Sequence, residues 1–74
     1  MDCHTIEQLI NEGLPGADAR VSSTDNVHFE AVVSFSGFQG KSPLQRHRMI
    51  YATLGDLLGG EIHALSIQTS VPEL

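Results

Sequence analysis

The feature that most constrains how this chain folds is a helical pattern set between two strand patterns. Apolar residues alternate over residues 28–35, as they do in a strand with one buried face. A helical apolar stripe follows over residues 43–58, and a second strand pattern occupies residues 62–69. A helix that joins two strands of one sheet favours a right-handed crossover and parallel strands. We therefore expect both strands to begin at the same edge of the sheet.

Local signals mark both ends of the predicted helix. Ser42 is a strong N-cap, Pro43 suits the first helical position, and Gln45 completes a capping box with Ser42. Gly59 marks the C-terminal end. At about 100° per residue, one broad apolar stripe takes in Leu44, Ile50, Tyr51, Leu54, Leu57 and Leu58. His47 falls in the middle of this stripe, so we expect it to be packed in the core with a buried hydrogen bond.

The N-terminal part of the chain predicts one more helix and one more strand. Residues 5–8 fit a capping box, and Gly13 ends the helix, whose apolar face consists of Ile6, Leu9 and Ile10. A short strand over residues 19–23 and turn residues at 24–26 then lead into the strand at 28–35, which predicts an antiparallel hairpin. The predicted fold class is α+β, in the order αββαβ: a three-stranded mixed sheet with both helices on one face.

Length, charge and cysteine content narrow the classes of protein to which this chain can belong. At 74 residues the chain has room for one hydrophobic core, so we expect a single domain over residues 1–74. Four Lys and Arg against nine Asp and Glu give a net charge of −5, which argues against an autonomous nucleic-acid-binding protein. No apolar run is long enough to cross a bilayer, and the single Cys3 cannot form an internal disulfide. We expect a cytoplasmic protein with no membrane partner, with an organelle stroma or matrix as the alternative.

Two histidines are the candidate metal ligands. His63 lies at the start of the last predicted strand, beside Gly59 and Gly60, where a partly buried structural histidine and a metal ligand are both open. His28 is the natural second ligand, because the two parallel strands begin at the same edge. Asp25 in the neighbouring loop is a further candidate, or simply a turn former. Two ligands leave half of a four-ligand shell open, so a metal centre here would be shared with another molecule.

Signals for nucleic-acid binding and for catalysis are weaker. Residues 37–40 match the GxxG pattern of KH domains, although Phe38 is better explained as a cover for one end of the core. The candidate nucleic-acid contacts are Lys41, Arg46 and Arg48. The two arginines project about 160° apart on a helix, so they straddle the apolar stripe. No paired carboxylates, phosphate loop or serine nucleophile motif is present in the sequence, and an enzyme is the least favoured class.

Ordered motifs over residues 27–69 resemble the BolA family. The family's F-x-G-x-S, R-H-R and I/V-H-A-L runs stand here as Phe38-Gly40-Ser42, Arg46-His47-Arg48 and Ile62-His63-Ala64-Leu65. The preceding "VHFEAVVS" looks like the family's H-F-x-x-x-V-V-S strand. The resemblance implies an αββαβ fold similar to class II KH domains, in agreement with the order derived above.

The resemblance also implies a function. BolA proteins pair with monothiol glutaredoxins carrying a CGFS motif, and the two share a bridging [2Fe-2S] cluster in iron–sulfur trafficking and iron homeostasis. His63 occupies the position of the family's cluster ligand, and thiolates of the glutaredoxin and of glutathione would complete the site. Many members carry a second ligand in a longer loop between the first two strands; here that loop is short and offers Asp25, Asn26 and His28.

We therefore predict a non-enzymatic adaptor that forms a heterodimer with a monothiol glutaredoxin around a shared [2Fe-2S] cluster. The isolated chain is expected to carry no cofactor and to be a monomer or weak homodimer. A KH-like DNA-binding transcriptional regulator is the alternative, and an interaction module that never binds metal is a third reading.

Overall fold

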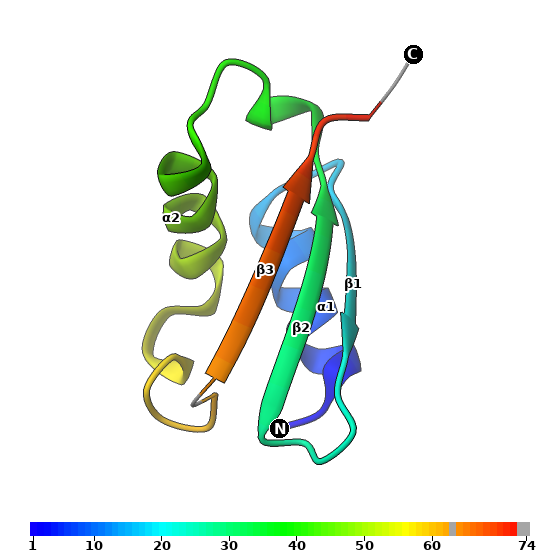
Figure 1. The fold of residues 1–74 in the computed structure, drawn as a ribbon, viewed down its shortest axis with the longest axis vertical. Coiled ribbons are helices and arrows are strands. Elements are labelled where there is room, and N and C mark those ends of the chain that lie inside the picture. The colour runs from blue at the N-terminus through cyan, green and yellow to red at the C-terminus, as the bar shows by residue number, and fades with distance from the viewer. Residues whose placement is uncertain (63, 73–74) are drawn as a thin grey trace.

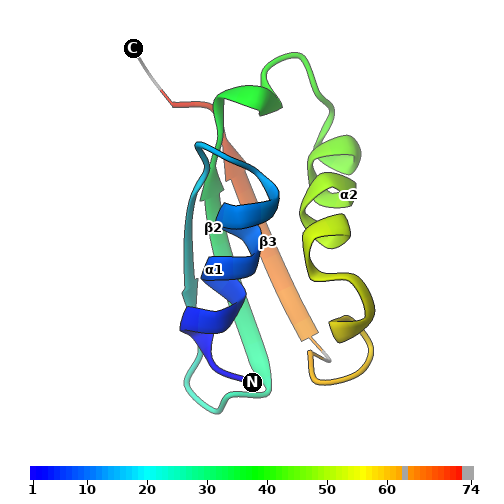
Figure 2. The same cartoon turned by 180° about the vertical axis from the view of Figure 1, so that it is seen from behind.

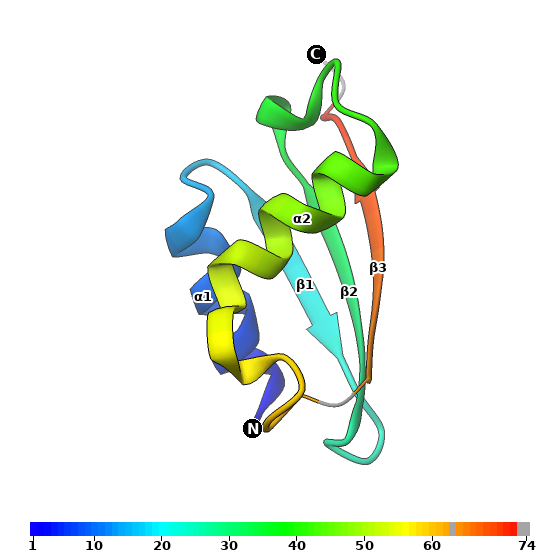
Figure 3. The same ribbon diagram turned by 90° about the vertical axis from the view of Figure 1, so that its left-hand side faces the viewer.

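The computed structural model describes residues 1–62 and 64–72. Its helices and strands are α1 (Cys3–Gly13), β1 (Asp18–Ser22), β2 (His28–Ser34), α2 (Pro43–Leu54) and β3 (Ala64–Ser70). The sheet order is β1-β2-β3, with β1 antiparallel and β3 parallel to β2 (Figure 1). Both helices cover the same face of the sheet (Figures 2 and 3). The predicted αββαβ order, mixed sheet and one-sided helix layer are confirmed, while the likeness to KH domains stays a prediction.

The core lies between the two helices and the sheet. Alternate residues of β2 point towards the helices, and Phe29, Ala31 and Val33 are at most 1% exposed, as the alternation of this segment predicts. The helices and the loops that join them to the sheet contribute Ile6, Ile10, Ile50, Leu54, Phe38 and Ile62. Among residues 1–62 and 64–72, no helix covers the opposite face of the sheet, whose exposed residues on β2 include His28, Glu30 and Val32.

α1 begins earlier than the sequence predicts. Asp2 has an extended backbone and is the N-cap, and its side chain accepts a hydrogen bond from the backbone N–H of Thr5 at 2.8 Å. The predicted capping box at residues 5–8 is therefore wrong, because the carboxylate of Asp2 already satisfies one of the free amides of the first turn. Cys3 is thus the first residue of a helix, and it packs half-buried against the core.

α2 ends four residues before the predicted end at residue 58. The capping box at its start is confirmed, since the Ser42 and Gln45 side chains each bond to the other residue's backbone amide. The helix stops because Gly55 takes a positive φ of 56°, and a short 3₁₀ turn over Gly55–Leu57 follows. The predicted apolar stripe is also too wide: Leu44 is 59% exposed and Tyr51 is 39% exposed.

The two helices approach each other closely at one point. A Cβ built on Gly13 at the end of α1 would lie 2.5 Å from Cγ2 of Thr53 on α2. The flank of α2 that carries Thr53 therefore faces α1, and the opposite flank faces away from it. In the described part of the chain, neither helix has the length and apolarity needed to cross a bilayer.

Candidate functional site

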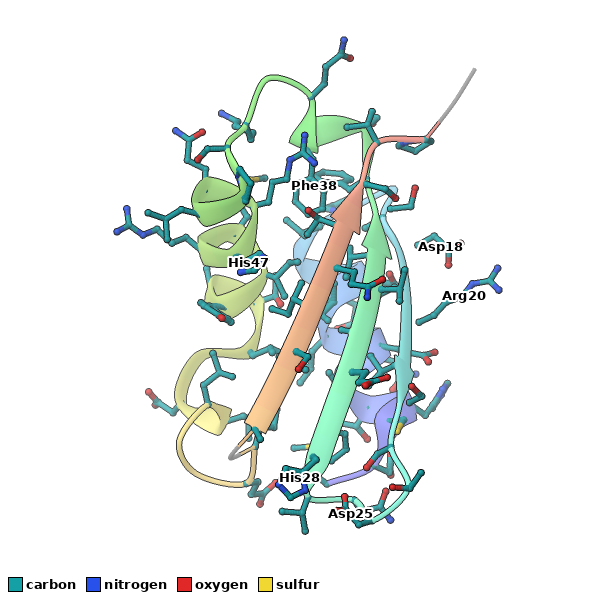
Figure 4. The ribbon with its side chains drawn as sticks, viewed as in Figure 1. Asp18, Arg20, Asp25, His28, Phe38 and His47 are labelled. Carbon is teal, nitrogen blue, oxygen red and sulfur yellow. The ribbon has the colours of Figure 1, made fainter. Side chains whose placement is uncertain are left out.

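The loop between β1 and β2 brings two of the predicted site residues together. Nδ1 of His28 lies 2.8 Å from Oδ2 of Asp25, and the two side chains lie together at the start of β2 (Figure 4). The other carboxylate oxygen of Asp25 accepts the backbone N–H groups of Val27 and His28, each at 2.9 Å. Asp25 is therefore the turn former that the sequence offered as one alternative, and it is also the partner of the His28 ring, a role that the sequence did not suggest.

Ser23, which the sequence reasoning did not single out, closes this loop. Its hydroxyl donates to the carbonyl of His28 at 2.6 Å and accepts the backbone N–H of Asn26 at 2.9 Å. Asn26 takes a positive φ of 57°, which Asn tolerates better than most residues with a side chain. The Ser-x-Asp-Asn-x-His spacing was the available signal, because Ser, Asp and Asn side chains commonly bond to backbone amides two or three residues away.

The contact between Asp25 and His28 fixes which ring nitrogen of His28 faces outward. With the carboxylate on Nδ1, the hydrogen bond favours a proton on that nitrogen, and in the neutral ring Nε2 then carries the lone pair. The His28 side chain is 74% exposed, so this nitrogen can reach a partner. Metal-binding histidines commonly have their second nitrogen bonded to a carboxylate in this way. The observed geometry therefore suits His28 as a ligand.

Asp25 is held in its ionised form by the same contacts. The hydrogen bond from the His28 ring, followed by the backbone amides of His28 and Val27, lowers the pKa of Asp25 well below its ordinary value. A carboxylate with a lowered pKa stabilises the fold at pH values above the ordinary pKa near 3.9. That contribution is lost as the pH falls through the lower pKa of the folded state.

We expect a carbon-detected NMR titration to show this shift directly. The carboxyl carbon of Asp25 should titrate at a pH well below the ordinary pKa of an aspartate side chain. In the His28→Ala variant the Asp25 midpoint should move up towards its ordinary value, because the first cause of the shift is removed. An Asp25 midpoint that is unchanged in this variant would contradict the assigned pairing.

The other candidate metal ligand is His63, at the start of the last predicted strand. His63 lies outside the described residues, but Ala64 directly after it pairs with His28 in the parallel register of β2 and β3. The prediction that these two strands begin at the same edge is thus confirmed. Among residues 1–62 and 64–72, no three His, Cys, Asp or Glu side chains gather closely enough to hold a metal ion. An open depression of about 230 Å³ beside the loop is lined by Ser22, Ser23, Thr24, His28 and Glu30.

The candidate nucleic-acid contacts lie at the opposite end of the sheet. Phe38 is fully buried there, as predicted, and the guanidinium carbon of Arg46 lies 5.8 Å from the centre of its ring (Figure 4). Nε of Arg46 also donates to the carbonyl of Lys41 at 3.0 Å. Arg48 is exposed on α2. The structure therefore brings Lys41 and Arg46 together at the start of α2, while the Arg46 side chain is partly engaged by the protein itself.

His47 differs from its prediction. Its ring is half-buried and lies edge-on to Tyr51, with 6.2 Å between the ring centres. The expected burial is wrong, because the side of α2 that carries His47 and Tyr51 faces away from α1 and is only partly covered. Figure 4 shows His47 on the side of α2 next to β3.

Comparison with known proteins identifies the family. The profile of the family described as BolA-like protein matches residues 7–73. The chain belongs to the BolA family. Human BolA-like protein 1 is 53% identical over 45 residues, which cover 61% of this chain and 33% of that protein. The DNA-binding transcriptional regulator BolA of Escherichia coli is 45% identical over 42 residues, which cover 57% of this chain and 40% of the regulator.

The fold of this BolA-family chain also matches solved structures. A BolA homologue from Coxiella burnetii superimposes with a TM-score of 0.86 at 40% identity, over 97% of this chain and 92% of that one. The matched segments span only about a third to two fifths of the length of the human and E. coli relatives. The match supports the family and the fold, and the names of relatives carry no residue roles over to this chain.

Proposed function

We propose that this BolA-family chain is an adaptor that pairs with a monothiol CGFS glutaredoxin around a shared [2Fe-2S] cluster. The observation that carries the proposal is the Asp25–His28 pair, which turns an accessible imidazole nitrogen outward at the edge where β2 and β3 begin. His63 precedes the β3 residue that pairs with His28, and it stands in the I-H-A-L run that resembles the family's ligand motif.

The proposed site is incomplete without its partner. A [2Fe-2S] cluster takes four protein or thiol ligands, and replacing thiolates by imidazoles raises its reduction potential. In this chain His63 is the proposed ligand and His28 the candidate second ligand, while Asp25 orients the His28 ring and keeps its outer nitrogen available.

A titration with a cluster-loaded CGFS glutaredoxin in the presence of glutathione tests this function. We expect a one-to-one heterodimer by size-exclusion chromatography, together with a change in the visible absorption and circular dichroism of the cluster. A cluster spectrum that stays identical to that of the glutaredoxin alone, with no heterodimer, would refute the proposal.

DNA binding is the second candidate function. Lys41 and Arg46 lie side by side at the start of α2, Arg48 follows on the same helix, and a bacterial relative is named as a DNA-binding regulator. Cations at one end of a domain can contact phosphates even where the net charge is −5, although the overall charge opposes binding.

The DNA hypothesis predicts weak, strongly salt-dependent binding to a duplex. Lys41→Ala or Arg48→Ala should weaken it, and each should reduce the slope of log affinity against log salt by about one. Arg20→Ala on the open face of β1 is the matched control, since it removes a cation far from α2. Absence of binding at low salt would exclude this function.

A further inference from the structure

In the part of the chain that the structure describes, the outer edge of β3 presents backbone groups that pair with no other strand. The carbonyl of Ser70 accepts the backbone N–H of Phe35 at 3.1 Å, so Ser70 directs its backbone groups towards the β2 side. Backbone groups of successive residues in a strand point alternately to its two sides. The N–H and C=O groups of Leu65, Ile67 and Thr69 therefore point away from the sheet. These three residues also have half-buried side chains on the helix side.

Side chains of α1 bond to the outward backbone N–H groups of β1, and among the described residues β3 has no such side-chain partners. On β1, the N–H of Ala19 donates to Asn11 of α1 at 3.0 Å, and the N–H of Val21 donates to Glu7 of α1 at 2.9 Å. No hydrogen bond from a described side chain to the outer backbone groups of β3 is seen in residues 1–62 and 64–72. The sequence of β3, ALSIQTS, also contains neither charge nor proline, two common means of blocking an edge strand.

One flank of α2 lies above this edge. Thr53 faces α1, and at about 100° per residue His47 and Tyr51 fall on the opposite flank. Figures 1 and 3 together show α2 on one face of the sheet, alongside β3. Leu44 and Tyr51 are exposed on α2, and Ile67 on β3 is only half-buried. An added strand would thus find unpaired backbone groups at its side and apolar side chains above it.

Charge distinguishes the two ends of the edge. Lys41 lies just before α2 and Arg48 in the first half of this helix, whereas Asp56 and Glu61 lie in the segment that leads from α2 into β3. The start of α2 lies at the end of the molecule where β3 finishes (Figure 1). β3 itself carries no charge. A chain of phosphates would meet the two acids along this edge, while a peptide with acidic residues at one end only would match the charge pattern.

We propose that the β3 edge binds an extended peptide of another protein as a fourth strand. The peptide would alternate apolar and polar residues and carry Asp or Glu at the end beside Lys41 and Arg48. Main-chain hydrogen bonds would come from Leu65, Ile67 and Thr69, which is the general mode of strand addition. The proposal does not depend on the cluster, because the candidate ligand loop lies at the start of β2 and not on this edge.

A second copy of this chain fits the edge less well than a single strand. Paired strands lie about 4.8 Å apart, whereas packed helices need about 8–10 Å between their axes. Because α2 packs on the sheet next to β3, two copies whose β3 strands pair antiparallel would bring their α2 helices closer together than packed helices lie. A lone extended peptide meets no such obstacle.

A displayed library of random 12-residue peptides, selected against the purified apo chain, tests the proposal. We expect enriched peptides that alternate apolar residues and end in Asp or Glu. Bound peptide should slow amide hydrogen exchange at Leu65, Ile67 and Thr69, while Ser66 and Gln68, already bonded to β2, should change little. Failure to enrich any such peptide, or protection that maps elsewhere, would overturn the proposal.

Two variants and a matched control sharpen the test. Ile67→Pro removes an outward N–H and should weaken the selected peptide by about tenfold or more. Tyr51→Ala changes an exposed side chain on α2 and leaves β3 intact, and it should also weaken binding of the selected peptide. This variant still tests the proposal if Ile67→Pro fails to fold. Gln68→Lys places its charge on the opposite face of β3 and should leave affinity unchanged. Peptide affinity that is equal in wild type and Tyr51→Ala would contradict the role of α2.

Two further measurements distinguish a bound peptide from two other possible occupants of the β3 edge, a nucleic-acid strand and a second copy of this chain. An oligo-dT strand should not protect the amides of Leu65, Ile67 and Thr69, and sedimentation should show no dimer that is lost on Ile67→Pro. Protection by oligo-dT in the absence of any peptide binder, or such a dimer, would overturn the assignment to a peptide.

Discussion

Replacement of His63 by alanine is expected to remove the cluster signal that this chain induces in a glutaredoxin heterodimer. The proposed site depends on an imidazole at this position, and the methyl group of alanine cannot bind iron. The visible circular dichroism of the mixture should therefore revert to that of the cluster-loaded glutaredoxin alone. A His63→Ala heterodimer whose cluster spectrum matches that of the unaltered protein would show that the ligand assignment is wrong.

Histidines elsewhere in the chain provide matched controls. His47→Ala should leave the spectrum unchanged, because His47 lies on α2 away from the start of β2 (Figure 4). His28→Ala should change the spectrum if His28 completes the site. Asp25→Ala should have a smaller effect, because it removes the contacts that orient the ring and shape the turn but removes no proposed ligand. If His63→Ala preserves affinity for the glutaredoxin both with and without the cluster, the chain is an interaction module that does not use metal.

The fold was predictable because its strongest signals are local and agree with one another. Three signals predict the same αββαβ arrangement: the alternation in β2, the Ser42 capping box and the helix between two strands. The parallel pairing of His28 with Ala64 follows from this arrangement. The ends of the elements were less predictable. Asp2 and Thr5 both suit an N-cap, and in the structure Asp2 takes this position, with its carboxylate bonded to the backbone N–H of Thr5.

The candidate site was predictable in its location but not in its contacts. Parallel pairing placed His28 at the edge where β3 begins, which sequence pattern can establish. Two hydrogen bonds hold the loop: the His28 ring donates to the Asp25 carboxylate, and the Ser23 hydroxyl donates to the His28 carbonyl. Both depend on the φ of Asn26, and this backbone angle is set by the whole loop. The exposure of Leu44 and Tyr51 was likewise missed, because a helical wheel cannot show how far a three-stranded sheet extends beneath a helix.

Replacement of Phe38 by alanine is expected to have the largest effect on stability. Its ring is fully buried, packs edge-on against Phe35 at 5.2 Å between centres, and lies beneath the guanidinium of Arg46. Truncating a buried Phe to Ala costs about 3–5 kcal/mol. A domain of this size has a free energy of unfolding of about 4–11 kcal/mol. The variant should thus lose much of its stability, which urea denaturation followed by circular dichroism would measure.

Leu44→Ala is the matched control, because the same kind of truncation is made on an exposed side chain at the start of α2. It should change the free energy of unfolding by no more than about 0.5 kcal/mol. Phe38→Leu should lie between the two, since leucine fills part of the space left by the ring. Equal urea midpoints for Phe38→Ala and Leu44→Ala would mean that Phe38 does not close the core at this end, and the F-x-G-x-S run would then need an explanation other than packing.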